Sequence, residues 1–279
     1  MKSRYFLVLT LALLASRAHA QVPPSPTDGT PTVVEAGPHH RVWQRVTVDD
    51  QGRTNVSSFT ELATGLNFWN STTGQWQASQ EDFDLTQPGF AIARTTQHRV
   101  TVAGNLNTPV SIDLESRDKQ HFQCHVFALA YEDAASGKNT LIAEVKDCVG
   151  QLVAPNQIIF PDAFTDVRAD YRITLTKAGL EADVILREQP PSPAEYGLPA
   201  DTSQLQVWTE FVQAPTPTEQ AALSTWGTNG VPNRFLIGPN DLTDERLSFG
   251  AMAFGQGRAF SLETRPSGTM NLGESEVPV

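Results

Sequence analysis

Short runs rich in valine, isoleucine, threonine and aromatic residues recur along this chain, and turn residues separate them. Within these runs apolar and polar side chains tend to alternate, which is the two-residue period of a half-buried β-strand. The segments between them contain the glycine and polar residues that turns favour, as in Asp50-Gln51-Gly52, Thr72-Thr73-Gly74 and Ser136-Gly137. The pattern predicts strands at 41–48, 55–62, 66–70, 75–79, 90–94, 98–103, 110–114, 120–132, 141–148, 157–160, 171–176, 181–187, 204–212, 246–254 and 258–263.

The sequence contains none of the long helical patterns that would connect parallel strands. We therefore expect an all-β fold, an antiparallel β-sandwich that forms either one body or two packed β subdomains. One short helix is expected within it. Thr216 can cap this helix, Pro217 suits its first position, and Glu219 completes a capping box.

Composition divides the chain into five segments. Prolines at 190, 191 and 193 cannot donate backbone hydrogen bonds to a sheet, so they mark either a boundary or a long crossing loop. The expected segments are a signal peptide at 1–20, a flexible proline-rich leader at 21–32, a β-sandwich domain at 33–188, a linker or crossing at 189–200, and a second β segment, truncated or whole, at 201–279.

The first twenty residues have the three parts of a Sec signal peptide. Lys2 and Arg4 supply the positive charge, residues 6–15 are apolar, and Ala18-His19-Ala20 is a small-x-small cleavage site. Cleavage is expected between Ala20 and Gln21. The apolar stretch is too short to span a bilayer, which takes about 20 residues, and no later segment qualifies. The sequence thus predicts a periplasmic or extracellular protein with no transmembrane segment in the mature chain.

The chain is acidic, with a formal net charge of −11. The predicted signal peptide carries three bases and no acid, so its removal lowers the charge to −14. Nucleic acid is therefore not an expected partner, because phosphate would be repelled and lysine and arginine form no cluster. A solvated acidic surface also suits an exported soluble protein.

No arrangement of residues predicts a catalytic centre, a metal site or a cofactor. Gly137-Lys138 lacks the glycine and the hydroxyl residue that a phosphate-binding loop requires. His121 and His125 lie on a predicted strand, about 13 Å apart, too far to share one zinc ion. The acidic groups at 81–84 and 241–245 lack the spacing of a calcium loop and are interpreted as solvated loops.

Tryptophan offers the main candidate for a binding surface. If residues 71–74 form a four-residue hairpin loop, Trp69 lies directly opposite Trp76. Two adjacent indoles can stack on a sugar ring, and Trp43 could extend such a surface. Cross-strand aromatic pairs also stabilise hairpins by packing alone, so both interpretations stay open.

The only two cysteines, Cys124 and Cys148, are predicted to form a disulfide. Export favours oxidation, and an even cysteine count leaves no spare thiol. Both lie on strands that Ser136-Gly137 would join as a hairpin, in which opposed cysteines come within reach of a bond. The bond would contribute about 3 kcal/mol at most. A one-residue slip in register would instead turn the thiols to opposite faces.

Several segments resemble a known family. The segments are Ala63 to Trp69 followed by Gly74-Gln75-Trp76, then Asn105-Leu106-Asn107, and the run from Pro155 to Leu186. They are similar to the N-terminal region of large secreted RHS or YD-repeat proteins of bacteria, especially of the Verrucomicrobia and Planctomycetes type. The resemblance implies a non-catalytic β module that precedes the repeats. The chain itself contains no YD repeat, and Glu181 stands where the family usually has a basic residue.

Three functions follow from these observations. The first is a non-catalytic structural or interaction module of an exported surface protein, whose partner is the rest of a larger protein or a component of the cell envelope. The second is a carbohydrate-binding module that uses Trp43, Trp69 and Trp76. The third is a hydrolase whose carboxylates or histidines come together only in the folded chain, which the sequence does not reveal.

Overall fold

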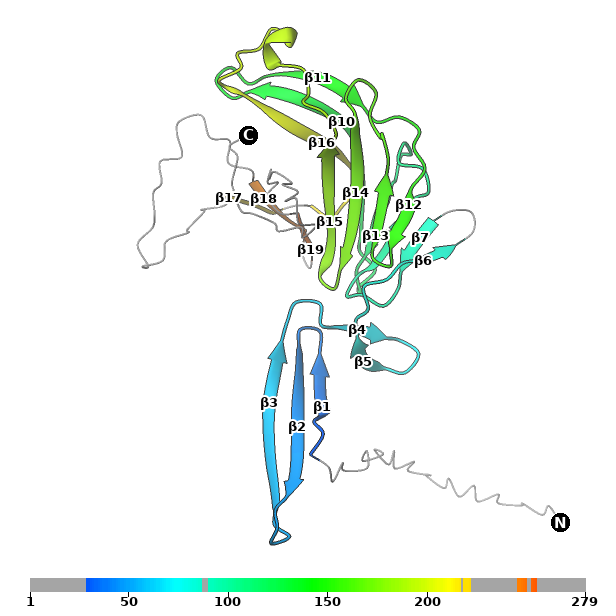
Figure 1. Cartoon of the computed structure of the whole chain (residues 1–279), viewed down its shortest axis with the longest axis vertical. Coiled ribbons are helices and arrows are strands. Elements are labelled where there is room, and N and C mark those ends of the chain that lie inside the picture. The colour runs from blue at the N-terminus through cyan, green and yellow to red at the C-terminus, as the bar shows by residue number, and fades with distance from the viewer. Residues whose placement is uncertain (1–28, 87–89, 217, 222–244, 250–251, 255–279) are drawn as a thin grey trace, which may run out of the picture. The chain divides into compact units, whose positions relative to one another are not determined.

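The computed structural model describes residues 29–86, 90–216, 218–221, 245–249 and 252–254, and these are mostly β-strands (Figure 1). The all-β fold with antiparallel sheets that the sequence predicts is confirmed. The signal peptide and its cleavage site between Ala20 and Gln21 lie outside the described residues, as does the strand predicted at 258–263. Among the described helices none is long and apolar enough to cross a membrane.

The first three strands form a sheet of their own, paired in chain order, which we call the N-terminal sheet. Its strands are β1 (Thr32–Gly37), β2 (His40–Val48) and β3 (Thr54–Leu62). The Asp49 carboxylate closes the turn between β2 and β3 by accepting hydrogen bonds from the backbone N–H groups of Gln51 and Arg53. Gly52 in this turn has a φ of +76°, which glycine adopts at little cost.

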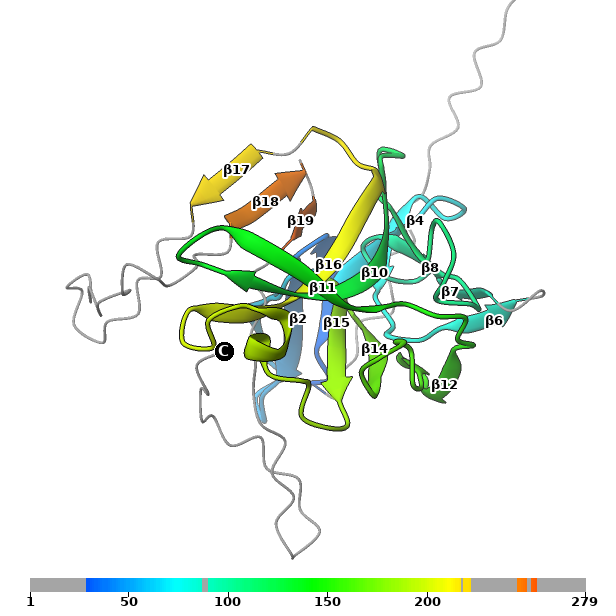
Figure 2. The ribbon, with the colours of Figure 1, turned by 90° about the horizontal axis from the view of Figure 1, so that it is seen from above.

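The largest sheet contains seven strands. They are β6 (Asp84–Thr86), β7 (Phe90–Ala93), β8 (Arg99–Val102), β9 (Ile112–Glu115), β10 (His121–Asp133), β11 (Lys138–Glu144) and β16 (Ser203–Gln213). Strand β16 pairs with residues 123–133 of β10 and so occupies one edge of it (Figure 2). Strands β9 and β11 therefore share the opposite edge, where they pair with residues 121–124 and 128–133.

A four-stranded sheet forms the second layer, in the order β12-β13-β14-β15. Its strands are β12 (Gln151–Ala154), β13 (Gln157–Phe160), β14 (Ala169–Thr176) and β15 (Gly179–Leu186). In β14 the side chains of Tyr171, Ile173 and Leu175 are buried, while Arg172 between them forms an ion pair with Asp183 directly opposite on β15. This alternation is the reason that one face of the sheet is apolar.

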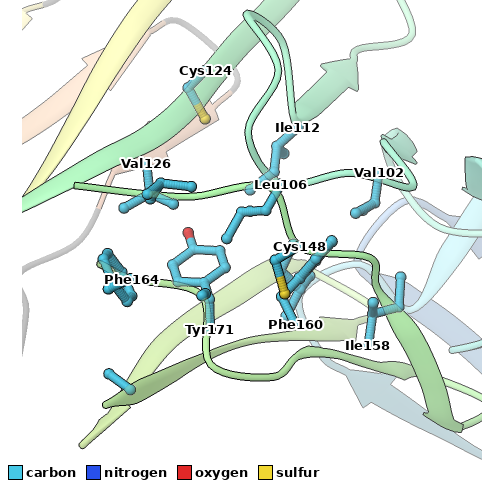
Figure 3. Packing of buried hydrophobic residues seen from close by; sticks show 14 of the residues in the cluster. Val102, Leu106, Ile112, Cys124, Val126, Cys148, Ile158, Phe160, Phe164 and Tyr171 are labelled. Atoms are coloured by element: carbon cyan, nitrogen blue, oxygen red, sulfur yellow. The ribbon is translucent and has the colours of Figure 1, made fainter. Parts of the chain in front are cut away.

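The apolar faces of the seven-stranded and four-stranded sheets meet in one core, and we call this two-layer body the sandwich. Val102, Ile112 and Val126 come from the seven-stranded sheet, and Phe160 and Tyr171 face them from the other (Figure 3). Phe160 is completely buried. Burial of this kind supplies the main driving force for folding.

Two smaller sheets complete the described chain. They are the hairpin of β4 (Asn67–Asn70) with β5 (Gln75–Ala78), and the sheet of β17 (Thr218–Ala221), β18 (Glu245–Phe249) and β19 (Met252–Phe254). Phe249 of β18 is buried, and its ring lies 5.0 Å from that of Phe122 and 5.7 Å from that of Phe211. The second small sheet therefore packs on the seven-stranded sheet at the start of β10.

The helix predicted at Thr216 to Glu219 is wrong, because the described residues Thr218–Ala221 form strand β17, which pairs with β18. The helical element of the described chain lies instead in the proline-rich segment, as the 3₁₀-helix η1 (Pro193–Tyr196). Ser192 caps it, and the Glu195 carboxylate accepts a hydrogen bond from the Ser192 N–H, which completes a capping box. The proline-rich segment is thus a crossing that leads from β15 to β16.

Two compact units make up the described chain. One comprises residues up to 35 together with 42–61, and so holds most of the N-terminal sheet. The other comprises 36–41 and everything from Leu62 onward, and it contains the sandwich. The proline-rich segment lies within the second unit and does not divide the chain, because β16 belongs to the same sheet as β10.

Candidate functional site

The tryptophan pair lies where the sequence predicts it. Asn70 pairs with Gln75, so Trp69 lies directly opposite Trp76 across the β4–β5 hairpin. The two ring centroids are 5.3 Å apart with an angle of 69° between the planes, an edge-to-face contact. Both indoles are half-buried. Edge-to-face packing stabilises an aromatic pair by about 1 kcal/mol beyond the area it buries.

Arg117 covers this pair, a contact that the sequence did not indicate. The carbon at the centre of its guanidinium lies 4.6 Å from the centroid of the Trp69 ring and 5.2 Å from that of Trp76. The residue lies in the β9–β10 turn, which Ser116 fixes by accepting a hydrogen bond from the Gln120 N–H. The side chain of Arg117 is otherwise exposed. A sugar could stack on these rings only beside the guanidinium or in its place.

Trp43 belongs to the other compact unit and is not part of this cluster. Its ring stacks on that of Phe59 with the centroids 6.1 Å apart, and its indole N–H donates to the Glu61 carboxylate at 2.9 Å. These contacts hold Trp43 on one face of the N-terminal sheet. The three tryptophans predicted as one binding surface therefore divide into a pair and a separate residue.

The opposite face of the N-terminal sheet carries a group of valines, two of which are exposed. Because Trp43 and Phe59 share one face, the alternating residues Val42, Val46 and Val48 of β2 and Val56 of β3 lie on the other. We call these four residues the valine face. Val48 and Val56 are 50% and 53% exposed. Every residue of β3 except Glu61 is exposed, which is unusual for a strand with this apolar pattern.

The outer face of the seven-stranded sheet carries a polar network. The Asp113 carboxylate bonds to the His121 ring through Nδ1 at 2.9 Å and accepts a hydrogen bond from the Gln123 amide at 3.2 Å. On strand β10, His125 Nε2 lies 3.6 Å from the Glu210 carboxylate. His121 and His125 therefore face different carboxylates.

Aromatic side chains continue this outer face along β10. The Phe127 ring lies 6.1 Å from that of His125 and 5.8 Å from that of Trp208 on β16. The Trp208 indole donates a hydrogen bond to Gln206 at 2.8 Å. The sequence around Trp208 does not indicate which face of β16 this residue occupies.

The acidic groups do not assemble into a metal centre within the described residues. The three acids between 81 and 84 contact different partners: Glu81 accepts from the Lys177 N–H, Asp82 from Thr95, and Asp84 from Arg94. Residues 241–244 of the second acidic group lie outside the described chain.

Cys124 and Cys148 are both free and buried in the structure. The paired residues of β10 and β11 have the predicted register at Ala128 and Leu129, but β11 ends at Glu144, before it could bring Cys148 opposite Cys124. Cys124 lies opposite Ile112 of β9 instead. Both side chains enter the sandwich core (Figure 3).

Burial raises the pKa of the Cys124 thiol to about 12, so this thiol is uncharged and unreactive in the folded chain. The disulfide stays a prediction that thiol titration of the unfolded, unreduced protein would test. Two reactive thiols per chain would match the structure, and none would show that the bond forms.

No family model, curated protein or solved structure matches this chain. The resemblance to the RHS and YD-repeat proteins therefore stays a prediction from the sequence.

Proposed function

We propose that this chain is a non-catalytic interaction module of an exported surface protein, and that the valine face is the surface that contacts its partner. The observation that carries the proposal is the exposure of apolar side chains on one face of the N-terminal sheet, where Val48 and Val56 are 50% and 53% exposed. Contiguous apolar patches of this kind are typical of interaction surfaces.

The free energy gained by burying apolar side chains favours a partner that covers this sheet. A sheet of three strands with an apolar face can be stable by itself, and a partner that covers this face stabilises it further by removing apolar area from water. Covering the exposed halves of Val48 and Val56 would stabilise a complex by about 1 kcal/mol each. The sandwich does not depend on a partner for its stability, because its core is buried within its own unit.

The partner is the remainder of a larger exported protein or a component of the bacterial cell envelope. The predicted signal peptide would bring the chain to that compartment, and the acidic composition suits it. The resemblance to the leading module of RHS and YD-repeat proteins supports the same partner class.

The test is co-sedimentation of the mature protein, residues 21–279, with cell envelopes of the bacterium that encodes it. We expect the unchanged protein to bind and Val56→Asp to weaken binding at least tenfold, since a charge would enter an apolar contact. The matched control is Ser57→Asp, which adds the same charge to the adjacent residue on the opposite face of β3 and should bind normally. Equal binding by the three proteins, or no binding by any of them, would contradict the proposal.

A second candidate function is recognition of an acidic carbohydrate at the tryptophan pair. The observation in its favour is Arg117, whose guanidinium lies over both indoles while its side chain remains exposed. A guanidinium held on aromatic rings keeps its N–H groups directed outward in its own plane, where they can bind a carboxylate. A sugar with a carboxylate would match this arrangement better than a neutral one.

A glycan array that includes uronate-containing oligosaccharides tests this second function. We expect binding of such glycans to fall at least tenfold in Arg117→Ala and to persist in Lys119→Ala, a lysine in the same turn that pairs with Glu115. Absence of binding to any acidic glycan would exclude this function.

A further inference from the structure

A cavity of about 390 Å³ lies on the outer face of the seven-stranded sheet, above β7, β8 and β9. Ala91 and Val102 point into the sandwich core, so Phe90 and Thr101 beside them point outward into the cavity. The β8–β9 loop forms the far wall. Six lining residues matter here: Phe90, Thr101, Thr108, Pro109, Val110 and Asp113.

The polar side of the cavity is held in place by the sheet. Thr101 lies directly opposite Asp113 on the paired strands β8 and β9. His121 and Gln123 hold the Asp113 carboxylate from β10, one at each oxygen. A carboxylate accepts about four hydrogen bonds, so each oxygen can still accept one from a ligand. Its orientation is fixed before any ligand arrives, which lowers the cost of binding.

Two hydroxyl groups add to this polar side. The side chains of Thr101 and Thr108 line the cavity, and neither hydroxyl makes a hydrogen bond to another residue of the described chain. Each can donate one hydrogen bond and accept two. The cavity therefore offers a carboxylate and two hydroxyls to one small ligand.

The other side of the cavity is apolar. Phe90 is 40% exposed, and the rings of Phe90 and Pro109 together with the Val110 side chain form the wall. A pyranose sugar has the matching distribution of groups, with an apolar face of C–H bonds and a rim of hydroxyls. An aromatic ring packs on the face, and a carboxylate and hydroxyls bind the rim.

We propose that this cavity is a binding site for a neutral pyranose ring, with Asp113, Thr101 and Thr108 binding its hydroxyls and Phe90 packing on its face. An acidic sugar would be repelled by the Asp113 carboxylate. The site is therefore distinct in ligand chemistry from the cluster of Trp69, Trp76 and Arg117. It does not depend on the valine face or on the identity of the partner.

The test is NMR titration of the ¹⁵N-labelled mature protein with four neutral oligosaccharides: cellotetraose, xylotetraose, mannotetraose and chitotetraose. We expect at least one of them, at up to about 10 mM, to shift the backbone amide signals of Thr101, Thr108 and Asp113. Asp113→Asn should weaken that binding at least tenfold, because it removes an acceptor. Thr101→Val, which keeps the side-chain shape and loses the hydroxyl, should weaken it several-fold.

Glu115→Gln is the matched control, since Glu115 lies on the same strand and face as Asp113 but does not line the cavity. It should leave binding unchanged. No shift at the three amides with any of the four sugars would overturn the proposal. Shifts confined to the indole signals of Trp69 and Trp76 would overturn it as well and would favour the tryptophan pair as the sugar site. Equal affinities for the unchanged protein and both cavity variants would also contradict it.

Discussion

The N-terminal sheet and the sandwich are both built from antiparallel strands that carry apolar side chains, yet they differ in what covers them. In β14 of the sandwich Tyr171, Ile173 and Leu175 are buried against a facing sheet. In β3 of the N-terminal sheet Val56 and Phe59 remain more than half exposed. The apolar residues of a short run therefore predict a strand, and they leave open whether the same chain or another molecule covers them.

This difference has a consequence for stability. Apolar side chains that are buried within their own unit stabilise the fold, whereas exposed ones are buried only when a partner covers them.

Phe160→Ala should destabilise the protein most. Phe160 is completely buried in the sandwich core, and truncating a buried phenylalanine costs about 3–5 kcal/mol, because apolar contact is lost and a cavity remains. Urea unfolding followed by circular dichroism would measure it. A loss below about 1 kcal/mol would show that the two layers are not packed as described.

Gly65→Ala should destabilise the sandwich unit by about 2–4 kcal/mol. Gly65 has a φ of +67°, and an added Cβ would lie 2.0 Å from the Lys177 carbonyl oxygen, part of the backbone between β14 and β15. The control is Gly74→Ala in the β4–β5 turn, where φ is +65° but nothing lies within 4 Å of the new Cβ. If both variants lost the same stability in urea unfolding, backbone strain alone would explain the effect and the contact with Lys177 would not matter.

Asp170→Asn should cost about 1 kcal/mol at neutral pH. Burial raises the pKa of Asp170, but hydrogen bonds from the Arg187 guanidinium and the Asp162 N–H outweigh it and leave the pKa below its usual range. A carboxyl with a lowered pKa stabilises the fold above its unfolded pKa of about 3.9, and this contribution disappears as the pH falls through the folded pKa.

The stability difference between the unchanged protein and Asp170→Asn should therefore be constant from pH 7 to about pH 5 and shrink below about pH 4. Urea unfolding at a series of pH values would measure it. A difference that stayed constant down to about pH 2 would mean that Asp170 is not held as a charged group.

Phe59→Ala in the N-terminal sheet should have the smallest effect, less than about 1 kcal/mol, although it removes the same side chain as Phe160→Ala. Phe59 is 54% exposed and its main described contact is the stacked Trp43 ring. Loss of the Trp43 contact should be visible as a change in tryptophan fluorescence. A loss of stability as large as that of Phe160→Ala would show that the N-terminal sheet has a covered core after all.

Much of the strand pattern could be predicted from the sequence. The predicted strand 157–160 coincides with β13, and the opposition of Trp69 and Trp76 follows from a four-residue turn that the residues themselves indicate. These features are local, because neighbours in the chain decide them. Arg117 reaches the tryptophan pair from the β9–β10 turn, which belongs to another sheet, so the residues around the tryptophans in the sequence do not indicate this contact.

The wrong helix prediction shows that pairing between strands can outweigh a local signal. Ser192 to Glu195 and Thr216 to Glu219 both have the capping-box spacing with proline at the first helical position. The first forms η1, whereas Thr218–Ala221 pairs with β18 as a strand. Sheet pairing overrode the local helix signal there. Near Leu129 the register of β10 with β11 is the predicted one, whereas Cys124 lies opposite Ile112 of β9, and the disulfide stays a prediction.

Amide hydrogen exchange in β2 and β14 tests most directly whether a partner covers the N-terminal sheet. Both are central strands with neighbours on each edge, so they differ mainly in the layer that covers them. In the mature protein alone, the amides of β2 should exchange much faster than those of β14, because less free energy is needed to open an uncovered sheet. Bound to cell envelopes, the β2 amides should slow at least tenfold while β14 does not change. Equal protection of the two strands in the free protein, or no slowing of β2 in the envelope-bound protein, would contradict the proposed interaction surface.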